Sequence, residues 1–427
     1  MDFSTSPSSS YITSLNNDSV IEKDYDRDFS PISALNPGSP IEFLIPGTGL
    51  LYVSLKDSYF DFQLKITQID NGNIDANATV GPANLIAHSL FSNIELYING
   101  KQVTEPTNHY HYRAYIQSLL NTTEYEQNKR LIMEGWKIDT SGYLNIVNAH
   151  DGLNTGLVAR KAWFAVSRWH RLILKPRIEL FNQDLVIPPN TDIRIRLIPN
   201  RDQVSLMWSG VTQFHTHIQS IRFWARSREV TSSTLIMHQQ QLHAGQSYKI
   251  AYPTISIKSL NVPIGSLRQE FDNLYLGNLP NRVILVMLSG DHVMGTTGSN
   301  PFNFQNFNIN YLAMRVNGEL VPRQAYQPNF GEAHDYIRDY LQVLAAIDLD
   351  GECSNTLCLS PSEWANGFTF FAFKLFQKGS SVKPSGSVRL DIRFGTLTAA
   401  IITILLFSES EGAIEIDKYK NVLLSSN

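Results

Sequence analysis

The sequence predicts an all-β fold in which two similar β domains follow one another along the chain. From about residue 40 onward, short apolar alternations are separated by Gly, Pro and Asn turns, which is the pattern of half-buried strands joined by tight turns. Helical periodicity is confined to a few short segments. A strand, an Asn-Gly turn, a return strand and a helix occur twice in the same order, about half the chain apart.

The composition is that of a globular protein with a low charge content. Of 427 residues, 43% are hydrophobic and 17% are charged, and the formal net charge is −4. This balance gives no basic stripe for binding nucleic-acid phosphates. The 22 Phe and 18 Tyr residues favour strands over helices. At about 100–200 residues per domain, the length fits two large β domains.

The N-terminal segment differs in composition from the rest of the chain. Residues 1–38 are rich in Ser, Asp, Asn and Pro, so we expect a flexible arm that becomes ordered against a neighbouring subunit, with plain terminal disorder as the alternative. The chain begins without the basic residues and apolar core of a signal peptide. The longest apolar run, residues 397–407, is shorter than the about 20 residues of a membrane-spanning helix, so no transmembrane segment is expected.

Individual strands are predicted where apolar and polar residues alternate. Residues 192–198 place three aliphatic residues on one face and two arginines on the other, as in a half-buried strand. Residues 282–288 form an almost continuous apolar run, typical of a strand buried on both faces. The other expected strands are 41–45, 59–67, 177–181, 218–228, 387–394 and 399–407. Helices are expected at 112–120, 124–133 and 333–346.

The duplicated unit begins with a hairpin. Residues 93–103 and 311–321 each place three apolar residues on one face of a strand before an Asn-Gly pair and a return strand. The two turns are Asn99-Gly100 and Asn317-Gly318. Asn-Gly is the strongest short hairpin signal because both turn positions require φ > 0.

The likeness between the two copies continues into the following helix. Arg113 and Tyr115 match Arg338 and Tyr340. The offset between the copies grows from 218 at the hairpin to 225 at the helix, a difference that one longer surface loop accommodates. We therefore expect these residues to occupy equivalent places in two related β domains.

Several stretches of the sequence resemble the hexon-like major capsid protein of Polinton (Maverick) elements and adintoviruses. They are residues 89–101 with 110–120, then 276–283, 300–304 (Asn-Pro-Phe-Asn-Phe), 327–330, 386–394 and 414–417. Each stretch is short, but their order and their spread over about residues 85–424 are specific. Residues 1–38 show no such match.

The resemblance implies two tandem eight-stranded jelly rolls with a few short helices in loops, an N-terminal one at 39–230 and a C-terminal one at 231–427. It implies a structural protein and not an enzyme, without a cofactor. Homotrimers with a pseudo-hexagonal outline would tile an icosahedral shell around double-stranded DNA, beside penton and minor capsid proteins. The protein would be made in the host cytoplasm and reside in the virion. The chain is compact for this class, which argues against prominent receptor-binding loops.

Catalytic and metal-binding patterns are sparse. The sequence contains no phosphate loop, nucleophile elbow or metalloprotease helix. His109 with His111, and His215 with His217, are spaced to share a strand face and offer two metal ligands each. Because no acidic or Cys partner follows at a suitable spacing, we expect polar or packing roles and no metal site.

Two other groups of residues invite a chemical interpretation. The carboxylates Glu332, Asp335 and Asp339 flank a predicted helix start, where an acid–base pair is one interpretation and favourable charge at a helix N-terminus is the expected one. Cys353 and Cys358 are too few for a disulfide framework or a four-ligand zinc site. Two free thiols are expected, and a small loop disulfide is the alternative.

Arginines and aromatic residues are mixed at 168–171 and 222–228, a combination that grips single-stranded nucleic acid. In the second stretch, however, apolar residues alternate with Arg222, Trp224 and Arg226. One face is therefore buried, and we expect the outer face to meet a neighbouring subunit, since Trp and Arg are enriched at interfaces. No sequence-specific nucleic-acid contact is expected.

Two rivals to the capsid interpretation stay open. A carbohydrate-binding or carbohydrate-cleaving β-sandwich would need a cleft with aromatic platforms and, for cleavage, two carboxylates about 5–9.5 Å apart. A minor capsid or spike protein would share the sandwich fold.

Overall fold

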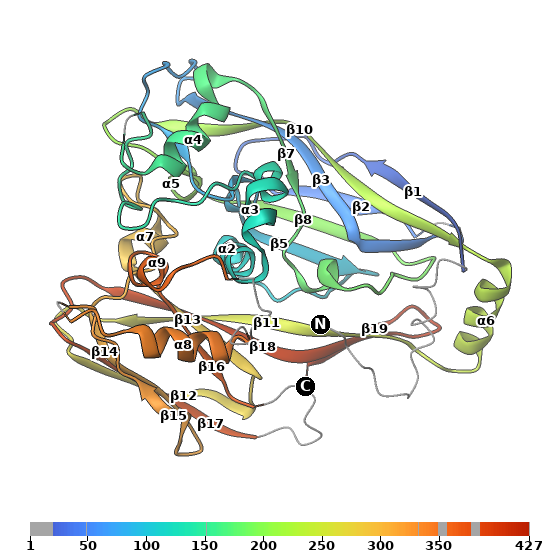
Figure 1. The fold of residues 1–427 in the computed structure, drawn as a ribbon. Coiled ribbons are helices and arrows are strands. Elements are labelled where there is room, and N and C mark those ends of the chain that lie inside the picture. The colour runs from blue at the N-terminus through green and yellow to red at the C-terminus, as the bar shows by residue number, and fades with distance from the viewer. Residues whose placement is uncertain are drawn as a thin grey trace.

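A computed structural model describes residues 20–47, 49–150, 152–331, 333–348, 357–376 and 385–426. Strands account for 42% of the chain and helices for 20%, so the prediction of an all-β class with helices in loops is confirmed. The strands form two halves that lie one above the other in Figure 1. One continuous cluster of buried apolar side chains runs through both halves.

The N-terminal half contains two four-stranded antiparallel sheets. The first has the order β1 (Ile21–Phe29), β10 (Phe214–Val230), β3 (Tyr52–Gln68) and β7 (His170–Leu174). The second has the order β2 (Ile41–Ile45), β8 (Ile193–Pro199), β5 (Phe91–Ile98) and β6 (Lys101–Gln102). A short ladder joins β4 (Gly81–Pro82) to β9 (Leu206–Met207). Alternate residues of β3 point into the core, namely Phe60, Phe62, Leu64 and Ile66.

The C-terminal half repeats this arrangement. Its first sheet has the order β11 (Tyr248–Val262), β18 (Ile402–Ile416), β13 (Arg282–Ser289) and β16 (Phe370–Lys374), and β19 (Val422–Ser426) pairs with β18. Its second sheet has the order β12 (Arg268–Asn278), β17 (Ser385–Phe394), β14 (Ile309–Val316) and β15 (Glu319–Tyr326).

The connectivity of the two halves is the same. When the eight main strands of each half are numbered in chain order, one sheet reads 1-8-3-6 and the other reads 2-7-4-5 in both halves. This is the double-sheet arrangement of an eight-stranded jelly roll. Between the halves, β10 ends at Val230, α6 (Ser232–His243) follows, and β11 begins at Tyr248. In Figure 1, α6 joins the halves at the right-hand end of the molecule.

The remaining helices lie in the connections. They are α1 (Ile86–Ser89), α2 (Tyr110–Asn121), α3 (Glu124–Lys129), α4 (Thr155–Trp163), α5 (Asp202–Ser205), α7 (Gly290–Met294), α8 (Ile337–Ala346), α9 (Pro361–Ala365), and the 3-10 turns η2 (Leu131–Glu134), η3 (Ala165–Ser167) and η4 (Glu179–Asn182). The helix expected at 124–133 is divided into α3 and η2, and the one expected at 333–346 begins only at Ile337.

The strand expected at 177–181 is wrong, because η4 occupies this place. Leu180 and Phe181 are both buried although they are adjacent in sequence. A strand would have pointed them to opposite faces, whereas a tight helical turn buries both.

The expectation of a flexible arm through residue 38 is wrong for residues 21–29. They form β1, an edge strand of the first sheet, paired antiparallel with β10. Only Tyr25, Arg27 and Phe29 among its last five residues are half-buried, so composition gave little sign of a strand. Residues 1–19 lie outside the described part of the chain.

Both Asn-Gly turns form two-residue hairpins of the same geometry. Asn99 and Gly100 have φ of 48° and 78°, and Asn317 and Gly318 have φ of 50° and 92°. The Asn99 side-chain oxygen accepts the Asp192 N–H at 2.9 Å. The Asn317 side-chain oxygen accepts the N–H of Ser387 in β17 at 3.0 Å. In each half the asparagine therefore has two roles. It adopts the positive φ that the turn requires, and its side chain links the hairpin to the neighbouring strand of the sheet.

The helices that follow the hairpins are α2 and α8, but their matched arginines lie in different surroundings. Arg113 is buried and bonded to Glu179, whereas Arg338 is exposed and donates to the Ala325 carbonyl at 3.2 Å. Tyr115 and Tyr340 are both buried. The equivalence of the four positions stays a prediction.

Replacing Gly318 with Ala should lower the free energy of unfolding by about 1–2 kcal/mol, because an L-residue with a Cβ is strained at positive φ. Calorimetric melting of the purified protein measures this. The control is Gly298→Ala, since Gly298 has no left-handed φ and a Cβ there meets no atom within 4 Å. Equal melting temperatures for the two variants would contradict the assigned turn.

Candidate assembly surfaces and the seam between the halves

A segment of the C-terminal half is inserted into the N-terminal half. Residues 300–304 lie between α7 and β14, and the rings of Phe302 and Phe304 are fully buried. Phe302 stacks on Tyr115 of α2 with ring centroids 4.2 Å apart, and meets Tyr112 edge-on at 5.9 Å. Such aromatic pairs contribute about 0.5–1.5 kcal/mol beyond their buried area. The insertion joins the apolar cores of the two halves.

A buried ion pair of the N-terminal half is hydrogen-bonded to Asn300, the first residue of this segment. Asp139 Oδ1 lies 2.7 Å from Arg160 Nη2, and both side chains are completely buried. Asn154 Nδ2 donates to Asp139 Oδ1 at 2.8 Å, and Asn300 Nδ2 donates to Asp139 Oδ2 at 3.0 Å. Arg160 Nε donates to the Pro82 carbonyl at 3.0 Å. Both carboxylate oxygens thus have donors, which is the condition for keeping a charge buried.

A second set of contacts holds β11 against the N-terminal half. Arg113 Nη1 and the Ile255 N–H both donate to Glu179 Oε1 at 3.0 Å. The Tyr248 hydroxyl donates to the Val186 carbonyl at 2.8 Å. Glu179 belongs to the turn η4, which stands where a strand had been expected. With the inserted segment, these bonds fix the two halves as one unit.

The outer face of β10 carries the residues assigned by sequence to a subunit interface, Arg222, Trp224 and Arg226. Arg222 pairs with Asp28 at 2.6 Å, and Arg226 pairs with Asp24 at 2.6 Å, both from β1. Trp224 is half-buried and stacks on Tyr59 of β3, with centroids 6.5 Å apart. The guanidinium groups already face carboxylates of the same chain and are poorly placed to neutralise phosphates.

The stretch 168–171 is likewise engaged within the chain. Arg171 pairs with Asp61, because its Nε and Nη2 atoms each donate to one oxygen of the carboxylate. Arg168 donates to the Ala162 carbonyl at 3.0 Å. Lys65 lies over the ring of Trp169, with Nζ 4.9 Å from the centroid. The cations of this stretch therefore do not form an open basic groove.

The two histidine pairs differ from each other. His109 precedes α2 and His111 lies in its first turn, so the shared strand face expected for them is wrong. Burial lowers the pKa of both, to about 3 for His111. His215 and His217 do lie on β10, with their Nε2 atoms 2.6 Å apart, at hydrogen-bond distance. Among the described residues, no group of three or more His, Cys, Asp or Glu is placed to hold a metal ion.

Asp335 and Asp339, the two described carboxylates near α8, differ in their surroundings. Asp339 is buried in the first turn of α8, and its Oδ1 accepts the Gln327 N–H at 2.7 Å. Burial raises the pKa of Asp339. Asp335 is exposed, while Glu332 and Cys353 lie outside the described residues. Cys358 Sγ lies 3.5 Å from the Thr122 carbonyl oxygen.

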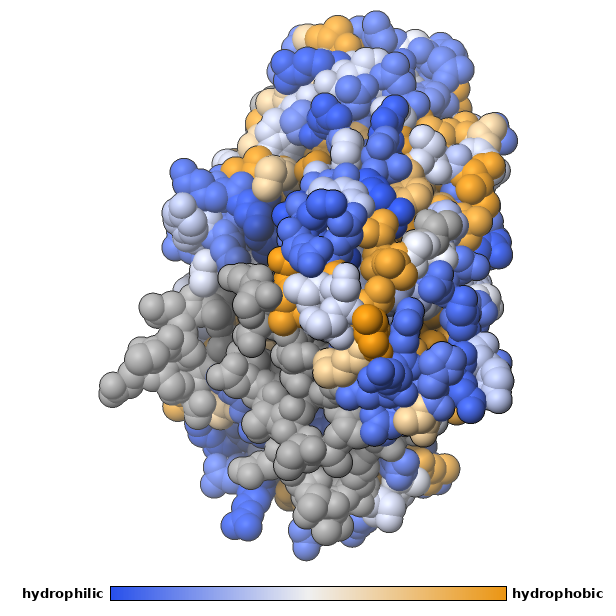
Figure 2. Space-filling model, turned by 90° about the vertical axis from the view of Figure 1, so that its right-hand side faces the viewer, coloured by the Kyte–Doolittle hydropathy of each residue, from blue (hydrophilic) through white to orange (hydrophobic). Residues whose placement is uncertain are grey.

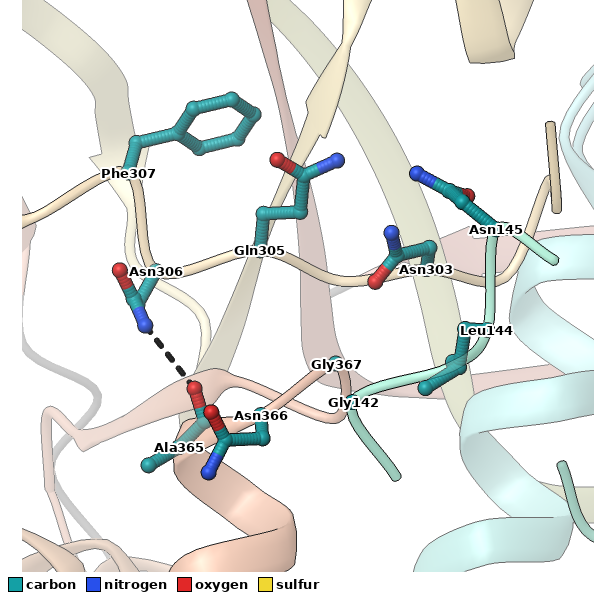
Figure 3. A pocket seen from close by; sticks show the side chains of 10 residues that line it. All are labelled: Gly142, Leu144, Asn145, Asn303, Gln305, Asn306, Phe307, Ala365, Asn366 and Gly367. Atoms are coloured by element: carbon teal, nitrogen blue, oxygen red, sulfur yellow. Dashed lines mark hydrogen bonds between the residues drawn. The ribbon is translucent and has the colours of Figure 1, made fainter. Parts of the chain in front are cut away.

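A pocket of about 350 Å³ opens at the seam between the halves (Figure 3). Its lining comes from 142–145 in the N-terminal half and from 303–307 and 365–367 in the C-terminal half. Five of the ten lining residues are Asn or Gln, and none has a titratable side chain. The carboxylate pair that glycoside cleavage needs is therefore absent from this lining.

Large apolar side chains are exposed at many places along the described chain, and some of them lie on the helices α8 and α6. On α8, Ile337 and Leu341 lie one turn apart and are each 57% exposed. At the end that carries α6, Ile236 and Met237 are exposed, and Figure 2 shows apolar residues among hydrophilic ones on this end. Exposed apolar groups of this kind mark contact surfaces when they are contiguous.

Several of these residues were not singled out from the sequence. Asp139 and Arg160 are 21 positions apart and carry no motif, and the pocket amides come from three distant loops. Arg113 and Tyr115 had been noted as members of the repeated unit, and the stretch 300–304 through a resemblance, but neither observation revealed the contacts at the seam.

Comparison with solved structures identifies the fold. The Faustovirus major capsid protein matches with a TM-score of 0.64 and 10% identity, covering 95% of this chain and 90% of that chain. The mavirus major capsid protein matches with a TM-score of 0.53 and 12% identity, covering 94% and 90%. The chain has the double jelly-roll fold of major capsid proteins. A chain of the Sputnik virophage matches this double jelly roll with a TM-score of 0.60 and 11% identity, covering 95% and 89%.

A sequence relative spans both jelly rolls. The uncharacterized protein F54H12.2 of Caenorhabditis elegans is 21% identical over 423 residues, and the match covers 92% of this chain and 95% of that protein. No protein-family model matches the sequence. Within the described part of the double jelly roll, none of the helices is both long and apolar enough to cross a membrane.

Replacing Asp139 with Ala should destabilise the double jelly roll by about 3–5 kcal/mol, because Arg160 would remain buried without its counter-charge. Urea unfolding followed by tryptophan fluorescence measures this. The control Lys56→Ala breaks the exposed pair with Asp184 and should change stability by less than about 1 kcal/mol. A similar small effect for both variants would show that the buried pair does not stabilise the seam.

Raising the salt concentration from about 0.1 to 1 M should speed amide hydrogen exchange in β1, because salt screens exposed charges. The pairing of β1 with β10 includes four ion pairs with N···O distances of 3.2 Å or less, which involve Lys23, Asp24, Asp26 and Asp28. Peptide-resolved exchange mass spectrometry measures this. The control is the corresponding strand β11, for which Lys249–Glu415 is the ion pair described with β18. Equal salt effects in β1 and β11 would contradict an electrostatic contribution.

Proposed function

We propose that this chain is a major capsid protein that assembles as a homotrimer and tiles an icosahedral shell around double-stranded DNA. The observation that carries the proposal is the presence of two jelly rolls of identical strand order, fixed to each other by a shared core. Three copies around a threefold axis place six similar units in a ring, and closed symmetric assemblies of this kind reuse few contacts. The role is structural and not enzymatic.

The surface charges favour a shell protein over a protein that reads nucleic acid. The net charge is −4, and the arginines on the outer face of β10 pair with aspartates of β1. Sequence-specific contact with the enclosed DNA is therefore not part of the proposal. The genome would be retained by enclosure within the shell or by other proteins.

The exposed side of α8 is the contact surface that we propose for a sister subunit. Ile337 and Leu341 project from α8 while Tyr340 and Val343 on its opposite face are buried. In Figure 1, α8 lies along the flank of the C-terminal half. Obligate interfaces bury about 2,000 Å² or more and are rich in apolar area. Ile337 and Leu341 would contribute part of that apolar area.

The outer face of β10, with Arg222, Trp224 and Arg226, stays a second predicted contact. Its arginines are satisfied within the chain, so a partner there would meet paired charges and the edge of Trp224. Such a face suits contacts between trimers more than the obligate trimer interface, because paired surface charges contribute little affinity.

The remaining parts of the proposal follow from the capsid role. Neighbouring trimers, penton proteins and minor capsid proteins would be the partners, and the virion the final location. Within the class, the stretches that resemble Polinton (Maverick) and adintovirus proteins support that group. A minor capsid or spike protein with the same fold is the alternative.

The purified protein should form a stable trimer of about 145 kDa, three times 48.2 kDa, because obligate interfaces keep apolar surface covered. Light scattering after size exclusion measures the mass, and negative-stain microscopy should show pseudo-hexagonal particles or shells. A protein that stays monomeric at all concentrations would overturn the proposal.

The trimer contact is tested separately with Ile337→Glu combined with Leu341→Glu. This variant should be monomeric at about 48 kDa and keep the melting behaviour of a folded chain, since both side chains are exposed. The matched control is Tyr125→Glu, whose side chain is 73% exposed on α3, and it should remain trimeric. If the α8 variant is also trimeric, the contact is assigned to the wrong surface.

A further inference from the structure

Some of the side-chain amide groups that line the pocket at the seam are not fully hydrogen-bonded within the protein. Figure 3 shows the side chains of Asn145, Asn303 and Gln305 pointing toward one another across the pocket. The Asn145 oxygen accepts the Asn300 N–H at 3.2 Å, which leaves its NH₂ group directed at the pocket. Asn303 and Gln305 make no side-chain hydrogen bond with other described residues, and Asn303 is only 9% exposed. Their amide atoms are therefore accessible from the pocket.

The loop that carries these amides is held in an unusual backbone conformation. Phe307 and Asn308 have φ of 45° and 53°. Asn306 fixes the loop, because its Oδ1 accepts the Asn308 N–H at 2.8 Å and its Nδ2 donates to the Ala365 carbonyl at 2.9 Å. Strain of this kind persists where the surrounding structure imposes it. The result is that Gln305 and the ring of Phe307 both border the pocket.

The chemistry of the lining defines the ligand. No lining residue is charged, so nothing compensates an ionic ligand for its desolvation. Each amide offers an acceptor oxygen and two donor hydrogens, which suits hydroxyl groups because these also donate and accept. An aromatic ring at the border adds an apolar face. The volume of about 350 Å³ is near the lower end of small-molecule sites, which are about 300–1,000 Å³.

We propose that this pocket binds a neutral carbohydrate of one or two sugar units through Asn145, Asn303 and Gln305, with Phe307 against one face of the sugar. An extended peptide fits less well. Peptides usually add to an exposed strand edge through backbone groups, and here the backbone N–H groups of Phe304 and Gln305 are bonded to Gly367 and Met287. The proposal is independent of trimer formation.

The test uses the full-length protein and three neutral disaccharides, lactose, maltose and N,N′-diacetylchitobiose, with saturation-transfer NMR and calorimetric titration. At least one should bind with a dissociation constant in the millimolar range or tighter. Gln305→Leu and Asn303→Leu should each weaken that sugar about tenfold, since each removes hydrogen bonds from a neutral ligand. The matched control Gln239→Leu, on exposed α6, should bind as the unmodified protein does.

Three results would overturn the proposal. They are no binding of any of the three sugars, equal binding by the pocket variants and the control, and binding of tetra-alanine but no sugar. Melting temperature and oligomeric mass are measured for every variant. Because a trimer that binds no sugar contradicts only the pocket, and a monomer that binds sugar contradicts only the capsid proposal, the two failures are distinguishable.

Discussion

The buried contact of Asp139 with Arg160 and Asn300 is the constraint on which the rest of the molecule depends. A charged pair without solvent is stable only when its hydrogen-bonding groups have partners, and one of those partners comes from the other jelly roll. Breaking the seam would expose this pair and the rings of Phe302 and Phe304 together. The two halves are therefore coupled, although their sheets have no strand pairing in common among the described strands.

Because of these contacts, the two tandem jelly rolls form a single structural unit. Two jelly rolls joined by a linker alone would change their relative orientation, whereas the proposed shell role requires a subunit of fixed shape. The inserted segment, together with the bonds from Glu179 to Arg113 and Ile255, fixes that orientation from both sides. The two matched arginines differ in this respect, because Arg113 bonds Glu179 at the seam while Arg338 is exposed.

The same seam creates the pocket that we assign to a neutral sugar. The loops that line it belong to the connections of each jelly roll, and such connections generally tolerate sequence change. The two proposed activities, assembly and sugar binding, would therefore use different parts of the surface around a shared core. In these proposals, assembly would use the exposed apolar side of α8, whereas the sugar site would use amides that the core holds in place.

The sequence by itself determined the class of the fold and the places of its hairpins. Period-2 alternation and the need for φ > 0 at Asn99-Gly100 and Asn317-Gly318 are local properties, so they can be read without the rest of the chain. The tertiary structure alone decided that residues 21–29 form a strand, because their carboxylates are stabilised by arginines about 200 positions away. It also decided the seam and the pocket, since polar groups brought together by folding leave no periodic pattern in the sequence.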